Sequence, residues 1–336
     1  MAVPRLRFMR CLVFALLVNA AFRSSAAQLT VGFYQNTCPD AESIITDTVT
    51  QKFGEAPSSA AATLRLLFHD CMIEVRCLHR FTSGCDASVI IASTPDNTAE
   101  KDALDNLSLA GDGFDTVIRA KQAVEAQCPG IVSCADVLAL ATRDLVALVE
   151  GPRYAVQTGR RDGRISMASR VTLPHANNSL DELVAIFAQK GLTRKDVVTL
   201  SACHTIGFTH CSQFSNRIFG FSSNNGVDPT MNPEFAQSLQ LACPQNVDST
   251  VVVNFDVTTP TKFDNAYYKN LRVGKGVLTS DEVLFTDRRT RGLVTLYAKR
   301  SGIFSDAFVT AITKMASIGV KVGNDGEIRR DCTQVN

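Results

Sequence analysis

The stretch Arg65-Leu66-Leu67-Phe68-His69-Asp70-Cys71 places an arginine and a histidine four residues apart in an apolar run. If this run is helical, both side chains leave the same face of the helix, one turn apart. The histidine can then take up or release a proton while the guanidinium stabilises negative charge that develops in a reaction. An arginine and a histidine at this spacing are more often surface or capping residues, so the surroundings decide whether the pair is catalytic.

A second apolar run, Leu200-Ser201-Ala202-Cys203-His204-Thr205-Ile206-Gly207, contains a single histidine near its end. It follows a capping box, Thr193-x-x-Asp196, which predicts one helix over residues 193–207. A lone histidine is more often satisfied within the core, but near the end of an apolar helix it also suits the axial position on a metal. Together the two runs resemble the distal and proximal haem segments of the secretory (class III) plant peroxidases.

That resemblance implies a fold and an activity. The fold is mostly α-helical and plant-peroxidase-like, with one haem b between a distal and a proximal lobe and few short strands. The activity is the reduction of hydrogen peroxide, coupled to one-electron oxidation of phenolic or aromatic donors. His204 would bind the haem iron, His69 would move the peroxide proton to the leaving oxygen, and Arg65 would stabilise the cleavage of the O–O bond.

The same resemblance gives both histidines a hydrogen-bond partner. Asn106, downstream of Glu100-Lys101-Asp102-Ala103, would bond His69 and fix its tautomer. Asp281, in Leu278-Thr279-Ser280-Asp281, would bond His204 and give it imidazolate character, which lowers the reduction potential of the iron.

Three more residues are expected around the haem by resemblance. Phe68 and Phe255 would contact it, and the carbonyl of Pro174 would help to seat an aromatic donor at its edge. The family motif usually has a second proline where this chain has Ala176, with His175 between the two positions. We therefore expect the donor geometry to differ in detail.

Oxygen-bearing residues flank both histidines at a density that suits a hard cation with many oxygen ligands. Alone, such aspartate and threonine runs would be ordinary turns, but each set includes the residue directly after its histidine. By resemblance they form two Ca²⁺ sites. The distal set is Asp70, Ile73, Gly84, Asp86, Ser88 and, through a water molecule, Glu100. The proximal set is Thr205, Asp256, Thr259, Lys262 and Asp264.

The N-terminal residues 1–27 are typical of a secretory signal, with three early arginines, an apolar run over residues 11–22 and a small-residue cleavage site, Ser25-Ala26-Ala27. We expect a mature chain from Gln28, secreted to the cell exterior or wall. It would keep 30 of the 34 basic residues against 33 acidic ones, a charge of about −3 that gives no reason to expect nucleic acid as a partner. No later segment is long or apolar enough to span a membrane, and we expect a monomer.

The chain has 11 cysteines, of which Cys11 would leave with the signal. In a secreted chain the remainder suggest disulfides, because they do not form paired C-x2-C metal motifs. Eight paired cysteines allow 105 connectivities, so their spacing cannot choose among them. The resemblance implies Cys38–Cys128, Cys71–Cys85, Cys134–Cys332 and Cys211–Cys243, with Cys77 and Cys203 left over.

Apolar spacing predicts helices joined by polar turns over residues 28–336, as a single haem peroxidase domain without repeats. The expected helices cover residues 41–53, 58–71, 114–128, 134–149, 179–190, 193–207, 233–241, 265–271, 290–299 and 305–318. The expected strands, at residues 154–156 and 251–253, are short. Asn177-Asn178-Ser179 is a plausible glycan site on an exposed loop, whereas we expect Asn106 to be buried despite its own sequon.

The chain departs from the family between Cys71 and Gly84-Cys85-Asp86, where twelve residues stand in place of the usual three. Deleting residues 75–83 restores an ordinary family segment. This atypical insertion is either a real loop or a splice or gene-model error. A real loop would spread the distal calcium ligands and bring Cys77 beside a disulfide.

Two other function classes compete with the peroxidase. One is a secreted Ca²⁺-binding or wall-binding protein of peroxidase-like fold, with catalysis impaired by the insertion. Haem binding would discriminate the two. The other is a hydrolase, which the sequence disfavours because Ser201 and His204 lie on one helix without a nucleophile elbow.

Overall fold

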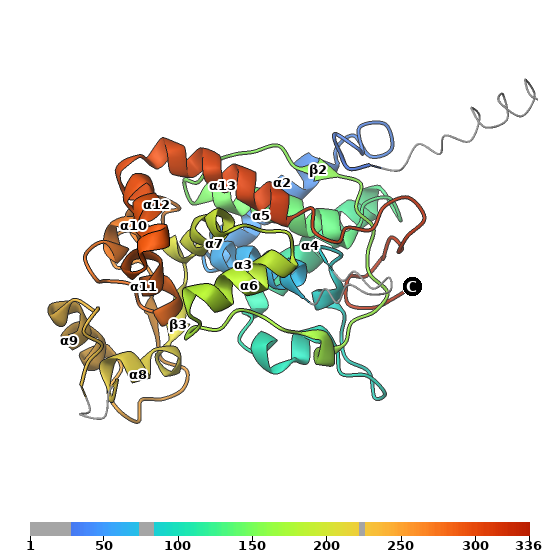
Figure 1. Ribbon diagram of the computed structural model, residues 1–336. Helices are drawn as coiled ribbons and strands as arrows, with labels where there is room; N and C mark the ends of the chain where they lie inside the picture. Colours follow the sequence, from blue (N-terminus) through green and yellow to red (C-terminus); the bar gives the residue numbers. More distant parts are fainter. Residues whose placement is uncertain (1–27, 74–83, 222–225) are drawn as a thin grey trace, which may run out of the picture.

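The computed structural model describes residues 28–73, 84–221 and 226–336. Helices dominate its regular secondary structure and the strands are few and short (Figure 1), which confirms the predicted mostly helical fold. The α-helices of the described residues are α2 (Ala41–Glu55), α3 (Ser59–Met72), α4 (Gly111–Gln127), α5 (Cys134–Leu148), α6 (Leu180–Gln189), α7 (Arg194–Ser201), α8 (Ser215–Ile218), α9 (Pro233–Ala242), α10 (Ala266–Leu271), α11 (Thr279–Thr286), α12 (Arg288–Lys299) and α13 (Ser301–Met315).

Short 3₁₀ helices and strands join these helices. The 3₁₀ helices are η1 (Ser88–Ile90), η2 (Glu100–Asp102), η3 (Leu104–Asn106), η4 (Ala168–Arg170), η5 (Ala202–Thr205) and η6 (Cys211–Gln213). The strands form two antiparallel pairs: β1 (Thr30–Val31) with β2 (Gln157–Thr158), and β3 (Phe208–His210) with β4 (Val252–Asn254).

Helices α2 to α5 pack against one another and hold α3 among them. Helix α5 is buried on every face, because its residues from Cys134 to Val146 all have little contact with solvent. It begins at Ser133, whose hydroxyl accepts a hydrogen bond from the Asp136 amide at 3.1 Å, an ordinary N-cap. Helix α3 is buried on most of its surface, because it packs on both α4 and α5. The tight packing of α3 fixes the directions of Arg65 and His69.

A second group of helices lies across from α3. Helix α10 packs on α12 and on the η5 turn, and α13 packs on α7. At the junction, Gly207 has a φ of +85°, and a Cβ atom there would lie 2.9 Å from the Cβ of Ala61 in α3. The chain after His204 can approach α3 this closely only because residue 207 is glycine.

The hydrophobic core falls into two clusters. The larger spans α2 to α7 and α10 to α13, with fully buried side chains such as Leu66, Leu67 and Phe308. The smaller surrounds the Cys211–Cys243 disulfide and includes Phe214 and Phe235. Figure 1 shows α8 and α9, which carry this smaller cluster, at the opposite side of the view from the chain's C-terminus.

Several predicted elements need correction. The helix predicted over 193–207 ends at Ser201 and continues as the tighter η5 turn, because Ile206 is already extended and leads into β3. The strand predicted at 154–156 lies later, at β2. Helices α8 and α11 and strands β1 and β3 were not predicted, since short elements carry too little periodicity.

The four disulfides in the described residues join the pairs that the family resemblance implies. Cys203 is a free thiol. The predicted signal, Cys77 and the residues 75–83 of the insertion lie outside the described residues. Within the part of the chain that is described, no helix has both the length and the apolar character needed to cross a membrane.

The carboxylate of Asp162 joins the start of α5 to the C-terminal segment. It accepts hydrogen bonds from the amides of Cys134 at 3.1 Å, Ala135 at 2.9 Å and Arg329 at 2.8 Å. Asp162 and Arg329 are both 0% exposed. The carboxylate thus satisfies two amides at a helix N-terminus, where no intrahelical partner exists.

We predict that Asp162→Ala lowers the free energy of unfolding by about 3–5 kcal/mol, because it leaves three buried amides without their acceptor and removes the carboxylate that lies 3.9 Å from the buried Arg329 guanidinium. Ser179→Ala, which removes the N-cap of α6, should cost only about 1 kcal/mol. Urea unfolding of both variants tests this. Equal losses in the two variants would contradict the role assigned to Asp162.

Candidate active site

His69 lies in the last turn of α3 and is held by a buried amide. Its Nδ1 lies 2.7 Å from Oδ1 of Asn106, and Nδ2 of Asn106 donates to the carbonyl of Glu100 at 2.7 Å. Since the Asn106 oxygen can only accept, Nδ1 of His69 carries the proton and Nε2 remains as a base. Burial, with help from the Arg65 charge, lowers the pKa of His69 to about 3. The imidazole is therefore neutral at ordinary pH.

Arg65 lies one turn before His69, and its side chain is exposed. Its guanidinium donates to the carbonyl of Ser108 at 2.6 Å and to the Ser108 hydroxyl at 2.9 Å. The predicted pair is thus brought together on one helix. The two residues are tied to the same turn of residues 104–109, one through Asn106 and the other through Ser108.

His204 lies in η5 and also has a partner on Nδ1. This nitrogen is 2.8 Å from Oδ1 of Asp281, near the start of α11. The Asp281 side chain is 3% exposed, whereas that of His204 is 33% exposed. With Nδ1 bound to a carboxylate, Nε2 is the nitrogen available to a metal.

Aromatic rings fix the plane of the His204 imidazole. Phe255 stacks on it with ring centroids 4.1 Å apart and an interplanar angle of 8°. Tyr267 meets it edge-on at 6.3 Å. On the distal side, Phe68 lies 6.0 Å from the His69 ring. Both predicted phenylalanines thus lie against the predicted histidines.

The residues of the predicted distal calcium site come together beside His69. Asp70 is 1% exposed and accepts amide hydrogen bonds from Ala87 at 2.9 Å and Val89 at 3.3 Å. Both carboxylate oxygens of Glu100 and the hydroxyl of Ser88 are buried without a hydrogen-bond partner. Burial raises the pKa of Glu100 to about 8 and raises that of Asp70 well above its usual value. Orphaned oxygens and crowded carboxylates suit a bound cation.

Lysine side chains contact two of these predicted ligands. Lys321 lies 3.1 Å from Oδ2 of Asp86, and Lys190 donates to the carbonyl of Ile73. At Gly84 the backbone is so close to Ile318 that a Cβ atom would overlap its carbonyl oxygen. The distal oxygens are therefore grouped, although Ile73 and Asp86 already have ammonium partners.

The predicted proximal residues also converge. The Thr205 hydroxyl lies 3.2 Å from Oδ2 of Asp256 and 3.4 Å from the Lys262 carbonyl. The Thr259 hydroxyl lies 3.1 Å from Oδ1 of Asp264. These carboxylate, hydroxyl and carbonyl oxygens fit a Ca²⁺ ion. Among the described residues, no group of three or more histidine, cysteine, aspartate or glutamate side chains forms a metal cluster, so hydroxyl and carbonyl oxygens have to complete either site.

The loop of Pro174 lies between the two sides of the site. Pro174 is half-buried, and the carbonyl of Ala176 accepts a hydrogen bond from the Ser280 amide at 2.9 Å, next to Asp281. In the other direction, Nδ1 of His175 lies 3.9 Å from Oδ1 of Asp105, next to Asn106. The loop thus touches the segments that hold both histidines.

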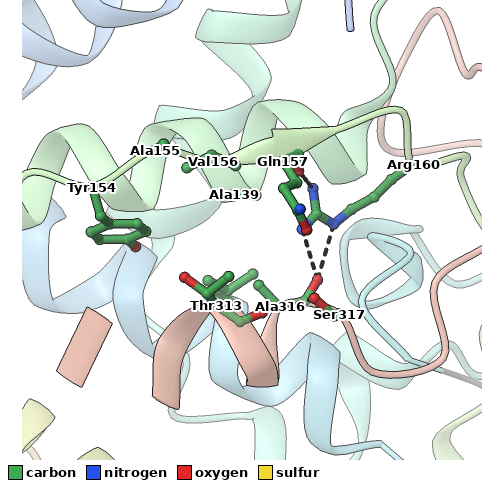
Figure 2. A pocket seen from close by; sticks show the side chains of 10 residues that line it. Ala139, Tyr154, Ala155, Val156, Gln157, Arg160, Thr313, Ala316 and Ser317 are labelled. Atoms are coloured by element: carbon green, nitrogen blue, oxygen red, sulfur yellow. Dashed lines mark hydrogen bonds between the residues drawn. The ribbon is translucent and has the colours of Figure 1, made fainter. Parts of the chain in front are cut away.

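A small pocket, seen in Figure 2, lies between β2 and α13. Tyr154, Val156 and Gln157 line one side, and Thr313, Ala316 and Ser317 line the other. Arg160 closes it with two hydrogen bonds to the Ala316 carbonyl, at 3.1 and 2.7 Å. It includes neither His69 nor His204, so it is a gap in the packing and not the predicted haem site.

Sequence reasoning missed two contacts in the site. One is Ser108, the partner of Arg65. The other is Tyr267, whose hydroxyl donates to Oδ1 of Asp281 at 2.8 Å. Tyr267 could have been suspected, because a tyrosine within a buried helix needs a partner for its hydroxyl.

Known proteins resemble this chain over nearly its whole length. The family described as “Peroxidase” matches residues 45–300. Peroxidase 51 of Arabidopsis thaliana is 51% identical over 320 residues, which cover 94% of each chain. Peroxidase 73 of the same plant is 51% identical over 93% of this chain and 94% of its own. Peroxidase 45 is 50% identical over 93% of each.

The raised pKa of Glu100 predicts a pH dependence in metal-free buffer. The unfolded chain loses this proton near 4.5, the ordinary pKa of a glutamate side chain, whereas the folded protein keeps it up to a pKa of about 8. The free energy of unfolding should therefore fall as the pH rises through this window. Glu100→Gln should flatten the fall, while the exposed Glu234→Gln should not. Urea unfolding at several pH values measures the free energy of unfolding. If it fell with pH as steeply in Glu100→Gln as in the wild-type protein, Glu100 would not be the group responsible.

Proposed function

This chain belongs to the peroxidase family, and from that membership we propose that His69 and His204 face the two sides of a bound haem. The protein is a peroxidase enzyme, and the family does not support the non-catalytic alternative. The family implies a haem cofactor, and hydrogen peroxide fits as its substrate. We infer one haem b per chain.

The observation that carries this proposal is that both histidines are held in the same way, through Nδ1. Each has Nδ1 on a side-chain oxygen, at 2.7 Å for His69 and 2.8 Å for His204, and each keeps Nε2 for other chemistry. An amide partner leaves His69 neutral and ready to accept a proton. A carboxylate partner makes His204 electron-rich, as an iron ligand should be. The same residue type thus serves as base on one side and as ligand on the other.

The mechanism follows from the residues of the chain. When bound, haem supplies the redox chemistry of peroxide reduction. Nε2 of His69 takes the proton of hydrogen peroxide and returns it to the departing oxygen, while Asn106 holds the imidazole in place. The positive charge of Arg65, one turn away, stabilises negative charge on that oxygen. Phe68 and Phe255 complete the apolar surroundings of the two histidines.

We infer that two Ca²⁺ ions support this site. The distal ion would be held by Asp70, Ile73, Gly84, Asp86 and Ser88, with Glu100 through water. The proximal ion would be held by Thr205, Asp256, Thr259, Lys262 and Asp264. The unpartnered oxygens of Ser88 and Glu100 support the first site, and the converging Thr205 and Asp256 side chains support the second.

We further infer that phenolic donors react near Pro174, whose loop touches both sides of the site. The disulfides are compatible with a secreted protein. We propose that residues 1–27 are removed, and that residues 28–336 act as a monomeric single domain at the cell exterior or wall. Whether residues 75–83 are part of the natural protein is decided by sequencing the transcript across them.

His204→Ala should abolish stable haem retention, because the axial ligand is lost while Phe255 and Asp281 remain. The measurement is the Soret absorbance per protein after purification, without added haem. His210→Ala, a change at a histidine outside this site, is the control and should keep its haem. Full Soret intensity and activity in His204→Ala would refute the assignment.

His69→Ala should keep its haem but slow the reaction with hydrogen peroxide by roughly 10²–10⁴-fold, the usual cost of losing an acid–base group. In the wild-type protein the base form should persist down to a pH of about 3, the pKa of His69. Stopped-flow rates against pH measure both effects. Normal peroxide kinetics in His69→Ala would show that another group is the base.

A further inference from the structure

The carboxylate of Asp281 serves more than His204. Its Oδ1 accepts hydrogen bonds both from Nδ1 of His204 and from the hydroxyl of Tyr267, each at 2.8 Å. Its Oδ2 lies 3.3 Å from the amide of Leu278, a third donor. The three donors come from η5, from α10 and from the residue before α11, so three separate segments meet at one buried carboxylate.

A carboxylate oxygen with two donors shares its negative charge between them. The hydroxyl of Tyr267 therefore withdraws part of the charge that Asp281 would otherwise place on the His204 imidazole. Burial and the Asp281 charge raise the pKa of the Tyr267 phenol well above its usual value, so the hydroxyl keeps its proton and stays a donor. Its ring also meets the His204 imidazole edge-on.

We propose that Tyr267 is a positioning residue for the axial ligand: its hydroxyl weakens the pull of Asp281 on His204 and so raises the reduction potential of the bound haem. This inference rests on the proposed function, since it needs His204 on the iron. A less electron-rich imidazole stabilises ferric iron less, which moves the potential upward.

Tyr267→Phe in the haem-loaded enzyme tests the proposal, because phenylalanine keeps the ring and removes only the donor. We expect a lower Fe(III)/Fe(II) potential by spectroelectrochemistry and a higher iron–histidine stretching frequency by resonance Raman spectroscopy of the reduced enzyme. Haem content should not change. An unchanged potential and frequency would overturn the proposal.

Tyr268 offers a matched control in the same helix. It is also buried, and its hydroxyl donates to the carbonyl of Val198 at 3.0 Å instead of to Asp281. Tyr268→Phe should lower the melting temperature and leave potential and frequency unchanged. If both variants shift the potential equally, the effect is general loosening and Tyr267 has no special role.

Two further measurements keep the test decisive. In an Asp281→Asn background, Tyr267→Phe should cause no additional shift, because its route to His204 runs through the carboxylate. Site-specific 3-fluorotyrosine at position 267 is a stronger donor with nearly the same shape and should raise the reduction potential. This substitution replaces Tyr267→Phe as the test if that variant folds poorly. The proposal would be overturned if Tyr267→Phe still shifted the reduction potential in the Asp281→Asn background. It would also be overturned if 3-fluorotyrosine at position 267 did not raise the potential. Haem retained by His204→Ala would instead refute the function on which it rests.

Discussion

A buried amide must satisfy both of its ends, and the Asn106 side chain does so in only one orientation. Its nitrogen is committed to the Glu100 carbonyl, so its oxygen has to face His69. That single orientation decides the tautomer of His69 and leaves Nε2 as the base. The side chain of Glu100 belongs to the predicted distal calcium site, so the same residue joins the cation site to the base through its backbone carbonyl. A shift of η2 would therefore reach His69 through two hydrogen bonds.

On the proximal side, the acceptor for the histidine is the charged carboxylate of Asp281 instead of a neutral amide. The position of Asp281 is fixed by the chain before α11, where fully buried Arg217 donates to the carbonyls of Gly276, Val277 and Leu278 at 2.6 to 3.0 Å. These bonds hold the entry to α11 while Phe255 holds the plane of the imidazole. Both histidines are thus held through Nδ1 but by different acceptors, an amide for His69 and a carboxylate for His204, and this difference suits one for accepting a proton and the other for binding iron.

The sequence predicted the parts of the molecule whose signals are local. Helices α3 and α5 carry long apolar runs, and both histidines lie in motifs of fixed spacing. Elements that depend on distant partners could not be predicted. Segment β3 is a strand only because Val252 to Asn254 lie beside it. Helix α7 ends and η5 begins because the chain must turn toward β3. The role of Tyr267 also depends on a distant partner, since its hydroxyl can bond Asp281 only in the folded chain, where α11 lies beside α10. Asp281 itself, 77 residues from His204, was found by family resemblance and not by spacing.

The last residues of the chain complete the part that is synthesised first. The Cys85 amide donates to the Ile318 carbonyl, Lys321 pairs with Asp86, Arg329 donates to the Ala87 carbonyl, and Cys332 is bonded to Cys134. As the polypeptide leaves the ribosome, helices α2 to α5 emerge long before these partners exist. The neighbourhood of Asp86 therefore stays incomplete until residues 318–332 have been synthesised, so more than 200 residues of chain must follow before these contacts can form.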